Sequence, residues 1–322
     1  MQIFIKSQKD YDNAVRNGLH AGNELVIQDC REFVSVHTDV TVAGNGRCKA
    51  KGGNEITVTV RENGAVTAEG KINILGFDNA NIAAKDNCKV SLQDAATANA
   101  GGNCHVTLKG KSRLSANDSC TVHAYDESAV SAFGKSKVFT YQKAVAQGTD
   151  VSSLAGKGAS TLIGKKQCRI KAQDSCLVFA TDGCKVEATG NCLVIANKDA
   201  VITTQKNCVV MTNGSPNVTL FDESDHLNLD TITEINVMGC IKRLSRSKAF
   251  IERPYLSLQL MMANIPPAQK TAVNRRLEAM GCKDQVSTKN YLYALVKVDS
   301  PARGSGDQAR KAPPNAAAGY ER

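Results

Sequence analysis

The chain lacks the features that mark membrane, exported and nucleotide-using proteins. No stretch approaches the roughly eighteen consecutive apolar residues that span a bilayer, and the N-terminus has no basic segment followed by an apolar one. Walker, Rossmann and zincin motifs are absent as well. We therefore expect a soluble, cytoplasmic protein that has no membrane contact and no nucleotide cofactor.

Histidine and aromatic residues are scarce, with 5 histidines and 5% aromatic residues in the chain. The cysteines form no Cys-x-x-Cys pair, so no metal site is expected. His105 and His123 have no obvious carboxylate partner. We therefore predict no catalytic residue and no cofactor, and an enzyme acting on a polysaccharide is the remaining enzymatic alternative.

What the chain has instead is an eight-residue period between about 40 and 218. Within this region nine cysteines fall on multiples of eight: Cys48, Cys88, Cys104, Cys120, Cys168, Cys176, Cys184, Cys192 and Cys208. The unit reads x-[Cys/Ser/Ala]-x-[Val/Ile/Leu]-x-[Ala/Thr]-x-[Gly/Asp]. Small and apolar residues take the even positions and polar residues the odd ones, which is the period of a strand with one buried face.

These octads predict a mainly β fold, a single-stranded parallel β-solenoid. Two octads form one rung of about 16 residues, one on each of two walls, and the repeat region gives about eleven rungs. Gly or Asp at the last inward position marks each turn, because Gly accepts positive φ and Asp can bond its own backbone. The Gly-rich stretch 142–164 stays in phase, either as degenerate octads or as a loop.

The repeat position of the cysteines indicates their role. They interchange with Ser and Ala, as small buried residues do. Cysteines sixteen apart, such as Cys88 and Cys104, would project in parallel from neighbouring rungs, which does not favour a disulfide. We expect reduced thiols in the core of a cytoplasmic protein.

The N-terminal segment departs from the octads. Residues 2–6 and 24–28 have the pattern of strands, and Ser7 can cap a helix over about 8–18. We expect residues 1–39 to form an α/β cap that covers the first rung, because stacked repeats expose a strand edge at their ends.

The C-terminal segment changes period after the octads, so the solenoid is assigned to 40–220. A small α-helical domain is predicted for 221–300. Its clearest helix begins at Pro267 and ends before Gly281. Residues 301–322 are rich in Ala, Gly and Pro and have the composition of a disordered tail.

Outward residues sixteen apart should form columns, and six of them on one wall make an apolar stripe: Leu177, Phe179, Leu193, Ile195, Val209 and Met211. An exposed apolar stripe indicates an interaction surface. Two interpretations follow. Either the stripe binds a partner or a second copy, or the C-terminal helices fold back over it with residues such as Leu256, Leu258, Leu260 and Met261.

A second set of outward residues forms an aromatic patch, in which His123 and Phe139 share one column and Tyr125 and Tyr141 another. The patch is either covered by the irregular segment 142–164, or exposed by chance, or a binding site for a ring-shaped ligand such as a sugar or a base.

The net charge of +9 is concentrated late in the chain. Six basic residues there are candidate contacts for nucleic acid or another polyanion: Lys242, Arg243, Arg246, Lys248, Arg275 and Arg276. Arg253 belongs to the same run. The alternative is an ordinary solvated basic face.

The octads DNCKVSLQ, GNCHVTLK, DSCTVHAY and ESAVSAFG resemble the octapeptide β-solenoid proteins of bacteria and their phages, over about 40–218. The resemblance implies the architecture and carries over no functional residue. Phage and type VI secretion spike needles also use octads, of Val-x-Gly type and wound from three chains. This chain departs from them, with Ala more often than Gly after the branched residue.

We therefore expect a non-catalytic bacterial or phage protein, a rigid solenoid scaffold that presents a C-terminal domain for a protein partner or for self-association. One alternative is a nucleic-acid-binding protein that uses the basic C-terminal helices. Another is a trimeric, phage-like spike or fibre component.

Overall fold

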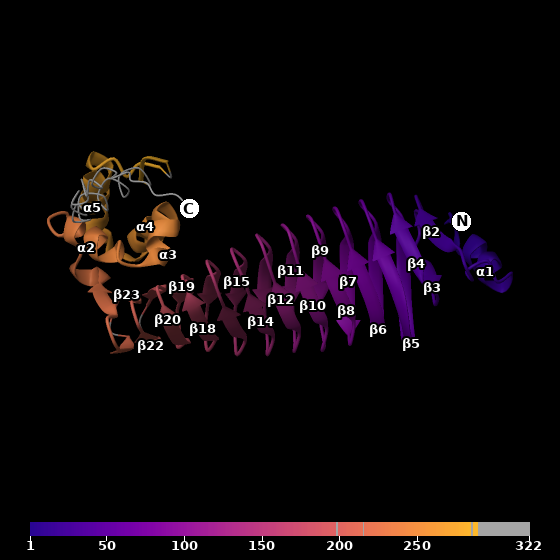
Figure 1. The fold of residues 1–322 in the computed structure, drawn as a ribbon, viewed down its shortest axis with the longest axis horizontal. Coiled ribbons are helices and arrows are strands. Elements are labelled where there is room, and N and C mark those ends of the chain that lie inside the picture. The colour runs from indigo at the N-terminus through magenta and orange to yellow at the C-terminus, as the bar shows by residue number, and fades with distance from the viewer. Residues whose placement is uncertain (198, 215, 285, 289–322) are drawn as a thin grey trace, which may run out of the picture.

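A rod of stacked parallel strands forms most of the molecule, and helices lie at its two ends (Figure 1). The structure is a computed structural model that describes residues 1–197, 199–214, 216–284 and 286–288. The tail predicted for 301–322, and the part of the predicted helical domain from 289 onward, lie outside the described residues.

The chain winds into a parallel β-solenoid, as the octads predict, and it has about 12 turns where the octads predict about eleven rungs. Strands pair with the strands of the next rung sixteen residues later, so Val90 pairs with Val106 and Val106 with Val122. Each of these neighbours belongs to the same chain. The described winding is therefore single-stranded.

One wall of the rod carries mostly polar outward residues, and we call it the polar wall. Its regular strands are β8 (Lys89–Leu92), β10 (His105–Leu108), β12 (Thr121–Ala124), β14 (Lys137–Thr140), β16 (Ser153–Gly156), β18 (Arg169–Asp174), β20 (Lys185–Gly190), β22 (Val201–Gln205) and β24 (Asn217–Leu220). Inward side chains alternate with outward ones along each strand, which puts the even positions in the core.

The opposite wall carries the C-terminal helices at one end, and we call it the helix-covered wall. Its regular strands are β7 (Asn81–Asp86), β9 (Thr97–Ala100), β11 (Arg113–Ala116), β13 (Ala129–Ala132), β15 (Val145–Gly148), β17 (Thr161–Gly164), β19 (Leu177–Ala180), β21 (Leu193–Ala196), β23 (Val209–Thr212) and β25 (Asp225–Asn228). The stretch 142–164 contributes β15, β16 and β17 in register, so it consists of degenerate octads.

The N-terminal cap has the predicted strand–helix–strand order and leads into less regular rungs. The cap contains β1 (Gln2–Ile5), α1 (Gln8–Arg16), β2 (Glu24–Gln28) and β3 (Val34–Val36), and the less regular rungs contain β4 (Val40–Ala43), β5 (Arg47–Val60) and β6 (Ala65–Gly76). Ser7 caps α1 by accepting a hydrogen bond from the amide of Asp10, 3.2 Å away. Tyr11 is fully buried and packs α1 onto the end of the core.

Cys48 does not occupy the position that the other repeat cysteines share. It lies within β5 and pairs with Val66, eighteen residues later, whereas Ile56 pairs with Ile72, sixteen later. The register shift between Gly52 and Ile56 therefore absorbs two extra residues. Because the insertion has an even number of residues, it preserves the inward–outward alternation. Cys48 therefore still points inward, although it lies at the strand position that Val66 holds in the next rung.

The turns differ in one respect from their predicted role. The turn aspartates are exposed, with positive φ, and are not inward residues. Several of these carboxylates reach the turn of the preceding rung: Gly110 donates its amide hydrogen to Asp126 at 3.0 Å, and Gly158 donates to Asp174 at 3.2 Å. The prediction that these aspartates bond their own backbone was wrong at these positions.

The cysteines that end these turns are buried free thiols. The Sγ of Cys104 lies 3.1 Å from the carbonyl oxygen of Gly101, and the hydroxyl of Ser112 donates to the carbonyl of Lys109 at 2.9 Å. Both side chains close the turn through the residue three positions earlier. The interchange of Cys and Ser therefore has a hydrogen-bonding basis as well as a steric one.

Strand stacking continues past residue 220, because β25 pairs with β23 within the segment predicted to be helical. The helices follow as η1 (Leu229–Thr231), α2 (Val237–Leu244), α3 (Lys248–Glu252), α4 (Pro254–Asn264) and α5 (Pro267–Ala279). Helix α5 is the one predicted between Pro267 and Gly281, and Gly281 has a φ of +87° just beyond it. Pro254 is the first residue of α4. The missing N–H of a proline costs nothing there, because the first amides of a helix have no intrahelical acceptor.

Candidate ligand-binding site on the polar wall

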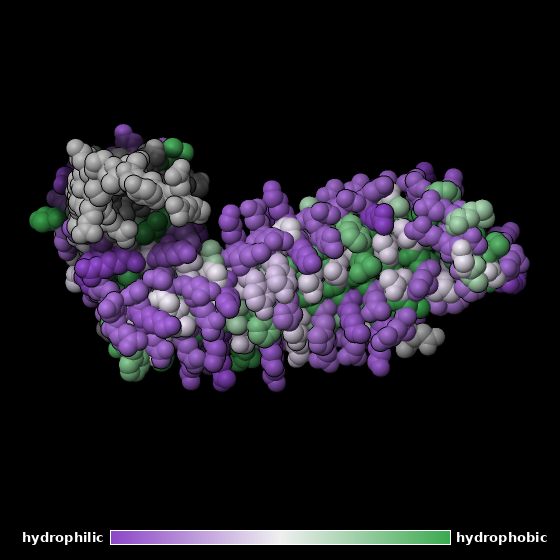
Figure 2. All heavy atoms as spheres, viewed as in Figure 1, coloured by the Kyte–Doolittle hydropathy of each residue, from purple (hydrophilic) through white to green (hydrophobic). Residues whose placement is uncertain are grey.

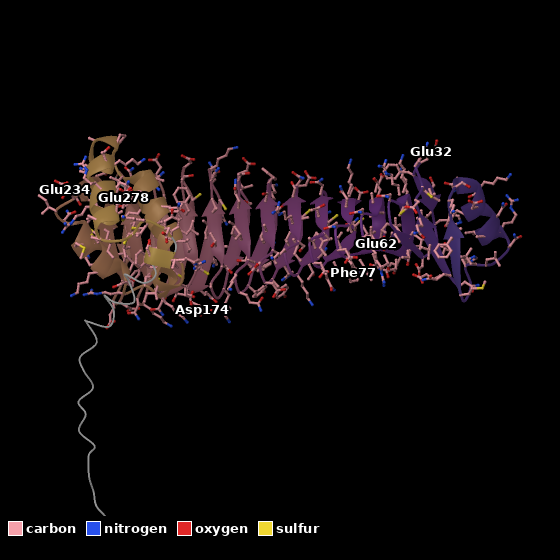
Figure 3. The ribbon with its side chains drawn as sticks, turned by 90° about the horizontal axis from the view of Figure 1, so that it is seen from above. Glu32, Glu62, Phe77, Asp174, Glu234 and Glu278 are labelled. Carbon is pink, nitrogen blue, oxygen red and sulfur yellow. The ribbon has the colours of Figure 1, made fainter. Side chains whose placement is uncertain are left out.

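The apolar stripe is an internal interface of the chain. Leu177, Leu193, Ile195, Val209 and Met211 are all 1% exposed or less, and Phe179 is half-buried. They pack in one cluster with residues of the C-terminal helices, and Figure 3 shows these helices lying over that end of the rod. The proposed partner surface at the stripe was therefore the wrong interpretation.

The covering residues match the predicted set only in part. Leu258 and Met261 are buried in this cluster and Leu260 packs against it, but Leu256 remains 39% exposed. Phe250 in α3 is fully buried there as well. The burial of these apolar side chains away from water stabilises the packing of the helices on the rod.

Two of the basic C-terminal residues hold the helices in place. Arg243 forms a two-pronged ion pair with Asp225 and also donates to the carbonyl of His226 at 2.7 Å. The Arg243 guanidinium holds the pKa of Asp225 below its ordinary value. These bonds point Arg243 at the last strand of the rod, so a polyanion would have to compete with them.

Arg253 lies deeper between α4 and the rod. Its guanidinium donates to the carbonyl oxygens of Ala159, Ser160 and Ser175 and to the hydroxyl of Thr161 at 3.0 Å. Burial lowers the pKa of Arg253. We call the helices α2 to α5 the helical unit. Arg253 joins two rungs of the rod to this unit and is not a ligand contact.

The other basic residues of this segment do not form one surface. Arg246 lines a hollow that also contains Glu223 and Asp225. Arg275 lines another hollow, between α4 and α5, with Glu278. Lys248 lies 3.7 Å from Glu252, and Lys242 and Arg276 are exposed.

The aromatic patch is present on the polar wall as two stacked columns. The ring centroids of His123 and Phe139 lie 4.9 Å apart with planes 14° from parallel, and those of Tyr125 and Tyr141 lie 4.7 Å apart at 10°. All four side chains are half-buried. Because 142–164 continues the solenoid, it does not cover them, and that interpretation was wrong.

The rung after the aromatic patch is built from small residues. Ala155 pairs with Phe139 on one side and Lys171 on the other, and Ser153 lies between Lys137 and Arg169. The short side chains leave a hollow of about 850 Å³, lined by Lys135, Lys137, Val151, Ser153, Gln167, Arg169, Gly183 and Lys185. Hydrophilic side chains predominate on the face of the rod shown in Figure 2.

The charge around this hollow is of one sign. Lys135, Lys137, Arg169 and Lys185 line it, all four are exposed, and no acidic residue is among its lining residues. Within the described part of the chain none of the four forms an ion pair, whereas Lys171 is 3.0 Å from Glu187. The sequence-based search missed this site, although the column Lys137–Ser153–Arg169–Lys185 follows from the sixteen-residue spacing.

The described residues contain no candidate metal site, since no group of three or more His, Cys, Asp or Glu could hold a metal ion. They also contain no helix that is long and apolar enough to cross a membrane. No known protein family, curated protein or solved structure matches the chain.

Proposed function

We propose that this protein is a non-catalytic scaffold whose polar wall binds a polyanion. The observation that carries the proposal is the hollow beside β16, which Lys135, Lys137, Arg169 and Lys185 line together with uncharged residues and no acidic one. Clustered cations without acidic partners attract anionic polymers, and a rigid sheet holds them in place before binding.

Binding of a labelled heparin fragment, measured by fluorescence anisotropy over a salt series, tests the proposal. Replacing the four cations together (K135Q, K137Q, R169Q, K185Q) should weaken binding at least about ten-fold at low salt. For the unaltered protein the logarithm of affinity should fall linearly with the logarithm of salt, with a slope of about −3 for four neutralised charges.

A matched variant removes the same charge from the helical unit: K242Q, R246Q, R275Q and R276Q. It should bind heparin nearly as well as the unaltered protein. If it loses as much affinity as the polar-wall variant, the basic helices or the net charge are responsible, and the site on the polar wall is not.

The scaffold's setting is also a proposal. We place it in the cytoplasm of a bacterium or of a phage-infected cell, supported by the octad resemblance, and assign contact with a protein partner or a second copy to the outer surface of the helical unit. Light scattering tests self-association: a mass of 34.3 kDa contradicts it, and a multiple of that mass supports it.

A further inference from the structure

The two aromatic columns end at the rung of β14, next to the rung of β16, whose Ser153 lines the hollow. Their ring centroids repeat every 4.7–4.9 Å, which is the spacing of neighbouring strands. The next position in the column of Phe139 holds Ala155, which has no ring. The face of Phe139 toward Ala155 therefore has no stacked ring from the described part of the chain.

The gap at Ala155 has room for one planar ring. Lys171 occupies the following position of the same column, so two strand spacings, about 9.5 Å, separate it from Phe139. Stacked bases lie about 3.4 Å apart. A base can thus rest on Phe139 above the methyl group of Ala155 and still leave space for the Lys171 side chain.

The cations lie where a backbone phosphate of that nucleotide would be. Lys137 and Arg169 belong to the neighbouring column, two residues and about 6.6 Å along the strands from Phe139 and Lys171. Aromatic faces beside a basic groove are the combination that binds single strands, because every base has a π-face and every nucleotide a phosphate.

We propose that the polyanion is single-stranded nucleic acid and that one of its bases stacks on Phe139 in the gap above Ala155. This inference rests on the proposed polyanion binding and makes it more specific. Duplex nucleic acid keeps its bases within its own stack, and sulfated polysaccharides have no aromatic ring. Both should therefore bind through the cations alone.

Two substitutions test the gap in opposite ways. Phe139→Ala removes the stacking surface, and Ala155→Leu fills the space from an outward position. Each should weaken binding of an oligo(dT) of about 15 nucleotides about ten-fold, the loss expected for one stacked base. Neither should change heparin binding. Phe77→Ala is the matched control, because Phe77 (labelled in Figure 3) is a half-buried aromatic residue at a turn several rungs away.

A spectroscopic variant reports stacking directly. The chain has no tryptophan, so Phe139→Trp introduces a single one. Oligo(dT) should quench its fluorescence, and heparin should not. If oligo(dT) and heparin bind but the three variants respond to both alike, the base site is overturned and polyanion binding stands. If heparin does not bind the unaltered protein, the proposed function itself fails.

Discussion

The carboxylate of Asp118 accepts a hydrogen bond from the backbone amide of Gly102 at 2.9 Å, although sixteen residues separate them in the chain. The two residues hold the same turn position on successive rungs, and both have positive φ. Similar bonds join other turns of the rod. The corners of the solenoid are thus held together by side chains as well as by the backbone ladder.

Asp118→Ala should lower the free energy of unfolding by about 2 kcal/mol, because it removes this bond and puts a Cβ-bearing residue without a polar side chain at a φ of +61°. Asp118→Gly should lose less, since glycine tolerates that φ. Asp118→Asn keeps an acceptor oxygen and should be close to the unaltered protein. Urea unfolding followed by circular dichroism measures all three, and equal stability of the Ala and Asn variants would contradict this role.

Two of the buried thiols, Cys48 and Cys168, should make stability fall at alkaline pH. Burial raises the pKa of Cys48 from 9.0 to about 12 and that of Cys168 to about 11. Between pH 9 and the raised value the unfolded chain loses a proton that the folded chain retains, so unfolding becomes easier as pH rises. The contribution is fully present below pH 9, and each thiol adds a loss of up to about 1.4 kcal/mol per pH unit.

Cys48→Ala should therefore show a shallower decline of the free energy of unfolding between pH 8 and pH 10.5, measured in urea at each pH. Its stability at pH 8 will be lower because of the lost packing, so the slopes are compared and not the absolute values. Identical slopes for the two proteins would show that Cys48 does not ionise on unfolding in this range.

Arg253→Met should loosen the helical unit from the rod. The substitution leaves the carbonyl oxygens of Ala159, Ser160 and Ser175 without their charged donor, which we expect to cost about 3 kcal/mol. Hydrogen exchange should rise in α3 and α4 before it rises in the solenoid. Arg246→Met, an exposed position in the same basic run, serves as the control and should leave exchange unchanged.

Ile195→Ala should destabilise the same packing through the apolar stripe. Ile195 is fully buried, so its truncation should cost about 2–5 kcal/mol. Phe179→Ala should cost less, because Phe179 is only half-buried. The rate of limited proteolysis of the helical unit and the free energy of unfolding in urea, measured for both variants, test this order. Equal protease sensitivity of Ile195→Ala and the unaltered protein would mean that the helices do not depend on the stripe.

Much of the rod could be predicted from the sequence because its determinants are local and repeated. The alternation of small apolar and polar residues specifies a strand with one buried face, and its recurrence every eight residues specifies two walls. The same register placed His123 beside Phe139 correctly. It misplaced Cys48, because a two-residue insertion changes the pairing without disturbing the alternation.

The candidate site could be predicted only in part. The aromatic residues stood out because they are rare, but the cations around Ser153 did not, since lysine is common at outward positions along the chain. Whether a cation is free to bind an anion depends on whether it already forms an ion pair with an acidic residue. Lys171 finds Glu187 and Arg243 finds Asp225, and those pairings depend on neighbours in space.

The sequence by itself determined the repeating backbone, the core and the columns, because strand alternation and turn chemistry act over a few residues at a time. Only the tertiary structure decided which columns remain exposed. The return of the helices over Ile195 depends on contacts such as Arg253 with Ser175, between residues far apart in the chain. The hollow at Ser153 likewise exists only when neighbouring rungs are stacked.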